Sequence, residues 1–195
     1  NFPKSPIFTD EQKNEIRIME KHLISHSEYF FTTSQTLFNE KRKINPNAVM
    51  MENGVSSLFL PENRDRLEPF AKECPLGEQE VIKEIRNIQR AKIGYLGSLN
   101  IRLQIEFIEQ LLKIPHEIQF CFVGNVDSSF PENIYSKMKS APNFSFFPFI
   151  SHSLAPFFFE QMDALILPFE LTECSRYINP LKFSEYLSSG KPIIS

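Results

Sequence analysis

The second half of the chain alternates short apolar runs with amphipathic segments, and this alternation restricts the possible folds more than any other feature. From residue 91 onward we expect strands at 93–96, 119–123, 144–147 and 164–167, with helices between them at 103–114, 132–139 and 154–161. The strand runs are apolar throughout, which is typical of strands buried on both faces of a parallel sheet. The sequence therefore predicts an α/β fold with a doubly wound, Rossmann-like parallel sheet in this half.

The first half shows the same kinds of element in fewer copies. We expect a helix at 9–26, a strand at 29–33, a helix at 34–43 and a strand at 48–51, followed by the turn dipeptide Asn53-Gly54. Residues 56–90 lack a strand pattern and contain one mostly polar helix, at 77–89. We therefore divide the chain into an α/β segment at 1–57, a linker with a helix at 58–90 and a second domain at 91–195.

Composition and charge exclude several classes of protein. The 195 residues carry a net charge of −3 and are 42% hydrophobic, which disfavours a disordered chain and a nucleic-acid binder. Cys74, Cys121 and Cys174 are odd in number and far apart, so we expect a reducing compartment and no disulfide framework. No apolar run reaches the ~18 residues that a membrane-spanning helix needs.

Both ends of the sequence indicate a fragment. The chain begins at Asn1 without a Met or a signal-peptide pattern, and it stops at Ser195 just as a strand opens. We therefore expect it to be a piece of a longer protein.

The last segment of the chain is predicted to be a short helix with an anion-binding start. Asn179 is a favoured N-cap, Pro180 suits the first helical position, and Gly190 ends the helix. The free backbone amides of such a start, together with the positive end of the helix dipole, attract a phosphate. Glu185, about one turn further along, could accept hydrogen bonds from two sugar hydroxyls, and Lys182 could contact the phosphate. The alternative is a capped surface helix with both side chains in solvent.

Other candidate residues follow the predicted strands of the second half. Ligands of a doubly wound sheet bind outside the carboxyl ends of its strands. The residues expected there are Gly97-Ser98, Gly124-Asn125, Phe149-Ile150-Ser151-His152, residues 169–178 and the helix that begins near Asn179. Gly97-Ser98 is not part of a GxGxxG motif, so it is either a plain turn or a loop that approaches a phosphate, with Arg102 or Asn100 adding a contact. His152 has no Cys, Asp or Glu near it in sequence that would complete a metal site, and no GxSxG motif supports a Ser-His-Asp arrangement, so a structural or surface role is the simpler interpretation.

Several segments share their order and spacing with one enzyme family. They are Asn53-Gly54-Val55, Ile93-Gly94-Tyr95-Leu96-Gly97, Asp163-Ala164-Leu165-Ile166-Leu167-Pro168-Phe169, Asn179-Pro180-Leu181-Lys182, Glu185-Tyr186-Leu187 and Gly190-Lys191-Pro192-Ile193-Ile194-Ser195. Together they resemble GT-B glycosyltransferases of the family 4 type, over most of residues 10–195. The closing segments, which resemble the donor site of that family, are the most specific.

The resemblance implies a two-domain enzyme that transfers a sugar from a nucleoside-diphosphate sugar to an acceptor hydroxyl, with neither cofactor nor bound metal ion. Residues 1–57 would be the tail of the N-terminal, acceptor-side domain, and residues 91–195 would be a nucleotide-sugar-binding C-terminal domain truncated at its end. The acceptor site and the catalytic base would lie in the missing N-terminal part, so the fragment alone would be inactive. A bacterial enzyme of surface-polysaccharide or lipid-linked glycan synthesis is implied, cytoplasmic and located at the inner face of the membrane.

The family's donor-site roles carry over by position. Glu185 matches the glutamate that binds the donor ribose. The remaining matches are the backbone of Asn179, Pro180 and Leu181 for the diphosphate-binding helix start, Gly97 and Ser98 for the loop that faces the diphosphate, Phe149 and Ile150 for the segment beside the base, and Arg102 for the cation after the first-strand loop.

One departure from the family pattern leaves part of the function open. The family's paired glutamates are eight residues apart, and Tyr177 stands eight residues before Glu185. The contact to the sugar and the stereochemical course are therefore open. Two alternatives also remain, a GT-B nucleotide-sugar epimerase and a non-enzymatic α/β module that binds a protein partner.

Overall fold

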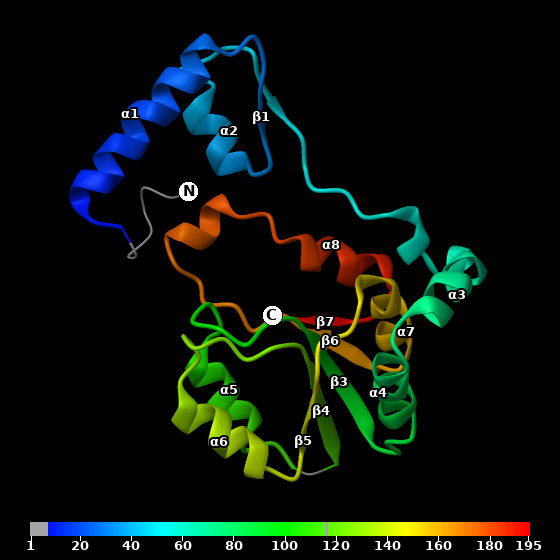
Figure 1. Cartoon of the computed structure of the whole chain (residues 1–195). Helices are drawn as coiled ribbons and strands as arrows, with labels where there is room; N and C mark the ends of the chain where they lie inside the picture. The colour runs from blue at the N-terminus through cyan, green and yellow to red at the C-terminus, as the bar shows by residue number, and fades with distance from the viewer. Residues whose placement is uncertain (1–7, 116) are drawn as a thin grey trace. The chain divides into compact units, whose positions relative to one another are not determined.

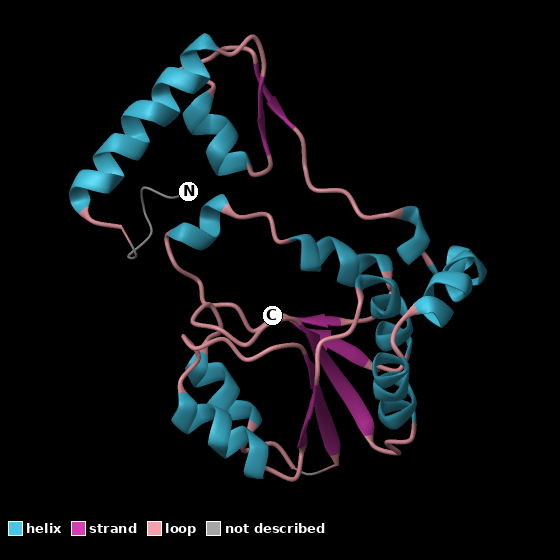
Figure 2. Ribbon diagram, in the orientation of Figure 1, coloured by secondary structure: helices cyan, strands magenta, loops and turns pink. Residues whose placement is uncertain are grey.

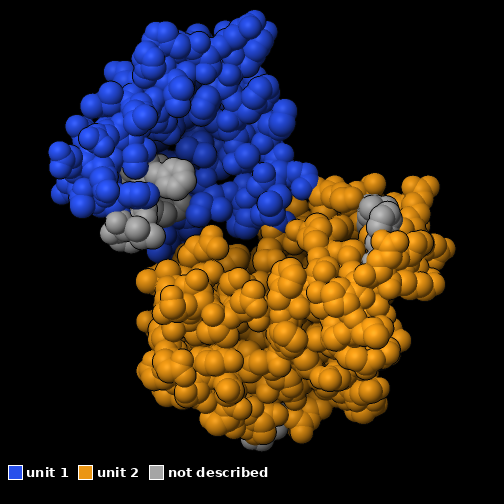
Figure 3. All heavy atoms as spheres, viewed as in Figure 1, with its two compact units in different colours: residues 1–54, 171–181 blue, residues 55–170, 182–195 orange. Residues whose placement is uncertain are grey.

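The structure, a computed structural model, describes residues 8–115 and 117–195 (Figure 1). The chain divides into two compact units (Figure 3). Unit 1 holds the residues up to Gly54 together with 171–181, and unit 2 holds residues 55–170 and 182–195. Residues 58–90 thus belong to the same compact unit as the sheet of the second half. The predicted domain boundaries at residues 57 and 90 refer to the whole protein, and they stay predictions.

Unit 1 is built on a small parallel sheet. Strand β1 (Phe30–Thr32) pairs with β2 (Ala48–Met50), and the unit also contains α1 (Asp10–His26), α2 (Gln35–Lys41) and the one-turn helix η5 (Cys174–Tyr177). Thr9 and Gln12 form a capping box at the start of α1, and the Ser34 hydroxyl accepts the Leu37 N–H at 3.3 Å at the start of α2. The order of elements expected for this half is confirmed.

Unit 2 is centred on a five-stranded sheet whose paired strands are all parallel (Figure 2). Its order is β5-β4-β3-β6-β7, in which successive strands run outward from β3 in one direction and then in the other. The strands are β3 (Ala91–Leu96), β4 (Ile118–Val123), β5 (Phe144–Phe147), β6 (Ala164–Ile166) and β7 (Ile193–Ile194). The doubly wound α/β fold is therefore confirmed.

Helices cover both faces of this sheet, each over its own hydrophobic core. Helices α4 (Leu76–Arg86), α7 (Ala155–Glu160) and α8 (Leu181–Ser188) contribute to one core through side chains such as Ile85, Phe158 and Tyr186. Helices α5 (Ile105–Leu111) and α6 (Glu132–Ser140) contribute to the other core and lie together on the opposite side (Figure 1). The strands are apolar on both faces because both faces are buried.

The segment before the sheet is more helical than its sequence predicts. It contains the short helices η2 (Ser57–Phe59) and η3 (Pro61–Asn63) and the helix α3 (Arg64–Glu73), none of which was expected. The expectation of a single helix here was wrong. Pro69 lies inside α3, where a proline normally argues against a helix, and Leu67 anchors the helix with only 3% of its surface exposed.

Candidate functional site

The candidate site begins where β3 and β4 end. The Gly97 N–H donates to the Val123 carbonyl at 2.9 Å, so the turn after β3 lies against the end of β4. Gly124 has a φ of +143°, and a Cβ atom placed there would stand 2.3 Å from the Gly97 carbonyl oxygen. Both the backbone conformation and the close approach require glycine at this position.

A buried tyrosine forms a hydrogen bond to the turn after β3. Tyr95 is 2% exposed, and its hydroxyl donates to the Ser98 carbonyl at 3.0 Å. Burial raises the pKa of Tyr95, and the charge of Arg102 opposes this shift. The phenol therefore stays protonated and serves as a fixed donor to the turn.

Helix α8 is fixed to the sheet by its own buried tyrosine. Tyr186 is fully buried, and its hydroxyl accepts the Leu96 N–H at 2.9 Å. The same helix carries Lys182, whose Cε atom would lie 2.8 Å from a Cβ placed on Gly97. The bare backbone of Gly97 thus leaves the space that the Lys182 side chain occupies.

Opposite charges meet in this space. Glu185 is 14% exposed, and its Oε2 lies 4.0 Å from the Lys182 Nζ atom, while its Oε1 lies 3.0 Å from His152 Nε2. Burial lowers the pKa of Lys182, and the Glu185 carboxylate opposes this shift. A partly buried cation and a partly buried carboxylate, side by side, suit a ligand that carries both an anionic group and hydroxyl groups.

These groups line one cavity of about 310 Å³ within unit 2. Its walls come from the ends of β3 and β4, the loop after β5, and the side chains of α8. The cavity therefore lies at the carboxyl edge of the parallel sheet, where ligands of such sheets bind.

Several known proteins are similar to this chain in sequence or in fold. No protein-family model matches the chain. TuaH of Bacillus subtilis (strain 168), named as a teichuronic acid biosynthesis glycosyltransferase, is 21% identical over 195 residues, which cover 98% of this chain and 46% of TuaH. HepE from Anabaena, solved in complex with UDP and glucose, superposes with a TM-score of 0.67 at 12% identity over 97% of this chain and 49% of HepE. WaaG, a glycosyltransferase involved in lipopolysaccharide biosynthesis, superposes with a TM-score of 0.64 at 12% identity over 95% of this chain and 49% of WaaG.

The chain has the GT-B glycosyltransferase fold. It spans about half the length of the proteins that it matches. The fold implied by the sequence resemblance is thereby confirmed, and the family 4 subclass stays a prediction.

Within this GT-B fold, most of the predicted donor-site residues lie together. The cavity is lined by Gly97, Ser98, Arg102, Phe149, Ile150, Lys182 and Glu185. Arg102 and Phe149 are exposed, whereas Ile150 is buried. The structure brings these seven residues together around one cavity. Their roles toward a ligand stay predictions.

The other three predicted residues, Asn179, Pro180 and Leu181, belong to unit 1. Their role toward a diphosphate stays a prediction. Helix α8 begins at Leu181, one residue later than expected, and the Asn179 carbonyl accepts a hydrogen bond from the Asn53 side chain at 2.6 Å. Tyr177, which replaces the expected second glutamate, is 8% exposed and donates its hydroxyl to Glu40 at 2.7 Å.

Sequence reasoning missed the two tyrosines that support the site and the pairing of His152. Tyr95 and Tyr186 lie inside the segments that carry the resemblance, yet no pattern assigns a partner to a buried hydroxyl. The His152–Glu185 contact joins residues 33 positions apart, and no local motif signals it.

The described part of the chain contains neither a metal-ligand cluster nor a membrane-spanning helix. Within residues 8–115 and 117–195, no group of three or more His, Cys, Asp and Glu side chains is arranged to hold a metal ion. In the same part of the chain, no helix is both long and apolar enough to cross a bilayer.

Proposed function

We propose that this cavity binds the nucleoside diphosphate of a sugar donor, and that the whole protein is a glycosyltransferase acting on an acceptor hydroxyl in glycan or surface-polysaccharide synthesis. The observation that carries the proposal is the placement of Lys182 and Glu185 beside the Gly97-Ser98 turn. TuaH is named as a glycosyltransferase of teichuronic acid biosynthesis and WaaG as one involved in lipopolysaccharide biosynthesis, and both names support the class of reaction. They do not favour an epimerase or a non-enzymatic module.

The cation and the turn would act on the diphosphate. When the glycosidic bond to the donor breaks, negative charge grows on the departing diphosphate. The Lys182 ammonium group and the backbone amides of Gly97 and Ser98 would stabilise that charge, which lowers the barrier. Arg102 at the rim would add positive charge. No metal ion is required in this proposal.

The carboxylate and the loop after β5 would recognise the nucleoside. Glu185 would accept hydrogen bonds from the ribose hydroxyls, and the segment at Phe149 and Ile150 would lie beside the base. The complex of HepE with UDP and glucose supports a uridine nucleotide as the first probe. A cytoplasmic location at the inner face of the membrane, and a glycan or lipid-linked acceptor, are part of the same proposal.

Replacing Glu185 by alanine is expected to weaken UDP binding by about tenfold to a hundredfold, because a hydrogen bond to a charged group is worth about 1.5–3 kcal/mol. Titration calorimetry of the 195-residue chain with UDP, GDP and ADP measures this directly. Glu84→Ala is the matched control, since Glu84 is an exposed carboxylate on α4 that does not line the cavity. The proposed function is wrong if the wild-type chain binds none of the three nucleotides at millimolar concentration.

A further inference from the structure

His152 occupies a constrained place beside the proposed ribose site. It opens the short helix η4 (His152–Leu154), which follows the loop after β5. The N–H of Ser151, at the cap of this helix, donates to the Glu78 carboxylate at 2.5 Å. On the other side of the same turn, the Ser153 hydroxyl lies 3.2 Å from the Cys74 sulfur. The backbone that carries His152 is thus tied on both sides to the segment before the sheet.

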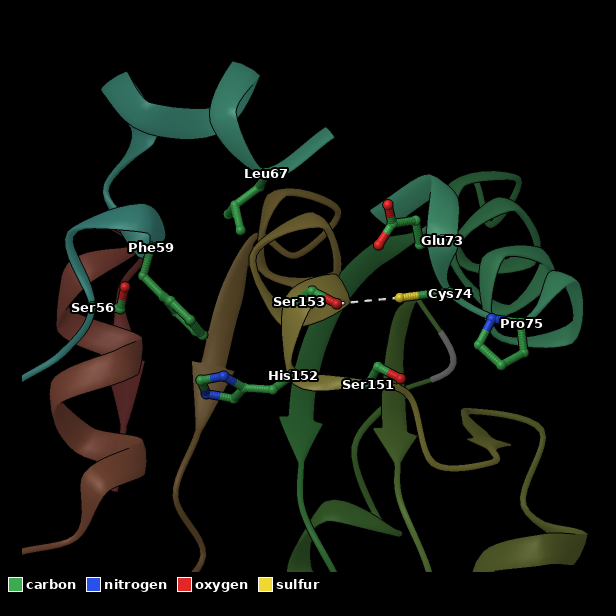
Figure 4. A pocket seen from close by; sticks show the side chains of 9 residues that line it. All are labelled: Ser56, Phe59, Leu67, Glu73, Cys74, Pro75, Ser151, His152 and Ser153. Carbon is green, nitrogen blue, oxygen red and sulfur yellow. Dashed lines mark hydrogen bonds between the residues drawn. The ribbon is translucent and has the colours of Figure 1, made fainter. Parts of the chain in front are cut away.

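The imidazole ring is also held from the side. The ring of Phe59 packs against it with a centroid distance of 4.6 Å and an interplanar angle of 42°. Figure 4 shows these two side chains pointing toward one another in a pocket of about 430 Å³. Phe59 is itself 3% exposed, so it is a firm support, although His152 keeps 68% of its side chain exposed.

The supported ring reaches the proposed ribose-binding carboxylate. His152 Nε2 lies 3.0 Å from Glu185 Oε1. A carboxylate only accepts hydrogen bonds, so Nε2 must carry the proton in this contact. His152 therefore donates to one oxygen of Glu185 and restricts rotation of the carboxylate plane.

We infer that His152 is a positioning residue, which holds the Glu185 carboxylate in the orientation that accepts hydrogen bonds from the ribose hydroxyls of the donor. This inference rests on the proposed function. Each carboxylate oxygen has two acceptor sites, so the bond from His152 leaves both oxygens able to accept from the ligand. Without His152, the carboxylate would turn freely or draw closer to Lys182, which lies 4.0 Å from Oε2.

The test is the selectivity of the 195-residue chain for ribose over deoxyribose, measured by calorimetry with UDP and with 2′-deoxyuridine diphosphate. We expect the wild-type chain to bind UDP about tenfold more tightly than the deoxy compound, and His152→Ala to reduce that ratio to about twofold or less. His152→Gln should restore most of the ratio, because its amide N–H can replace the Nε2 proton. A loss of general structure would weaken both nucleotides equally and leave the ratio unchanged.

His26→Ala is the matched control, because His26 is an exposed histidine at the end of α1 and does not line the cavity. It should keep the wild-type ratio. An unchanged ratio in His152→Ala, or a ratio lost equally in His26→Ala, would overturn the inference.

A second measurement separates this inference from the proposed function. Nitrogen-15 NMR of the His152 ring at a pH of about 8.5, where imidazole is ordinarily neutral, should show the Nε2-protonated tautomer in the wild-type chain. Glu185→Ala should shift the ring toward a tautomer mixture. If the ring signals do not respond to Glu185→Ala, the positioning role is wrong whether or not UDP binds. If they respond and no nucleotide binds, the contact stands, and both the ribose role and the proposed function fail.

Discussion

Replacing Gly124 by alanine is expected to lower the free energy of unfolding of the chain by at least about 2 kcal/mol. The residue has a φ of +143°, a conformation that an alanine reaches only with strain. A methyl group would also meet the Gly97 carbonyl oxygen at 2.3 Å, and that oxygen is backbone that cannot rotate away. The turns after β3 and β4 would have to separate, so the candidate site would be distorted as well. Urea unfolding followed by circular dichroism measures the loss.

Gly77→Ala is the matched control for this substitution. Gly77 lies in the first turn of α4, and nothing lies within 4 Å of a Cβ placed there. Alanine favours helices over glycine by up to about 1 kcal/mol, so the control should be neutral or stabilising. Equal destabilisation by the two substitutions would contradict the proposed packing of the Gly97 and Gly124 turns.

Replacing Tyr186 by phenylalanine is expected to lower the free energy of unfolding by about 1–3 kcal/mol, because the buried Leu96 N–H would be left without an acceptor. The Leu96 N–H donates to the Tyr186 hydroxyl at 2.9 Å, and Tyr186 is fully buried against the Phe159 ring at a centroid distance of 5.3 Å. Removing the hydroxyl removes the acceptor while the shape of the ring is kept. Because this bond fixes α8 to β3, UDP binding should weaken too.

Denaturant unfolding and UDP titration of Tyr186→Phe, compared with Tyr135→Phe, would check this result. Tyr135 packs edge-on against Phe146 at 5.4 Å, and its hydroxyl has no hydrogen-bond partner among the described residues. The control should therefore lose less than about 0.5 kcal/mol, as substitutions away from such features do. A Tyr186→Phe chain as stable as the wild type would show that the bond to Leu96 contributes nothing.

The sheet of unit 2 could be predicted from the sequence because its strands are buried on both faces. Runs such as residues 119–123 are apolar throughout, and the helices between them bury one face each, so both element type and parallel order follow from simple patterns. Helix α3 could not be predicted in this way. Its Pro69 and its many charged residues suggest an irregular segment. The burial of Leu67 in the folded unit, which supports the helix, cannot be seen in the local sequence.

The candidate site was predictable only in part. Local sequence patterns of a helix start and a strand end were enough to predict Lys182, Glu185 and the Gly97-Ser98 turn. Tyr186 and His152 make the contacts that hold them in place. These contacts join elements far apart in the chain, so no local sequence pattern indicates them. The start of α8 shows the same limit, since Asn179 bonds to Asn53, 126 positions away, and no local rule reveals this pairing.

The proposed function requires that the cavity at the carboxyl edge of the unit 2 sheet binds a nucleoside diphosphate. The most direct test is to titrate UDP into the nitrogen-15-labelled chain and follow the backbone amide resonances by NMR. We expect the largest shifts at Gly97, Ser98, Lys182 and Glu185, which all line the cavity, and little change at Gly77 on α4. Absence of any shift at millimolar UDP, or shifts confined to residues outside the cavity, would show that this cavity is not a nucleoside-diphosphate site.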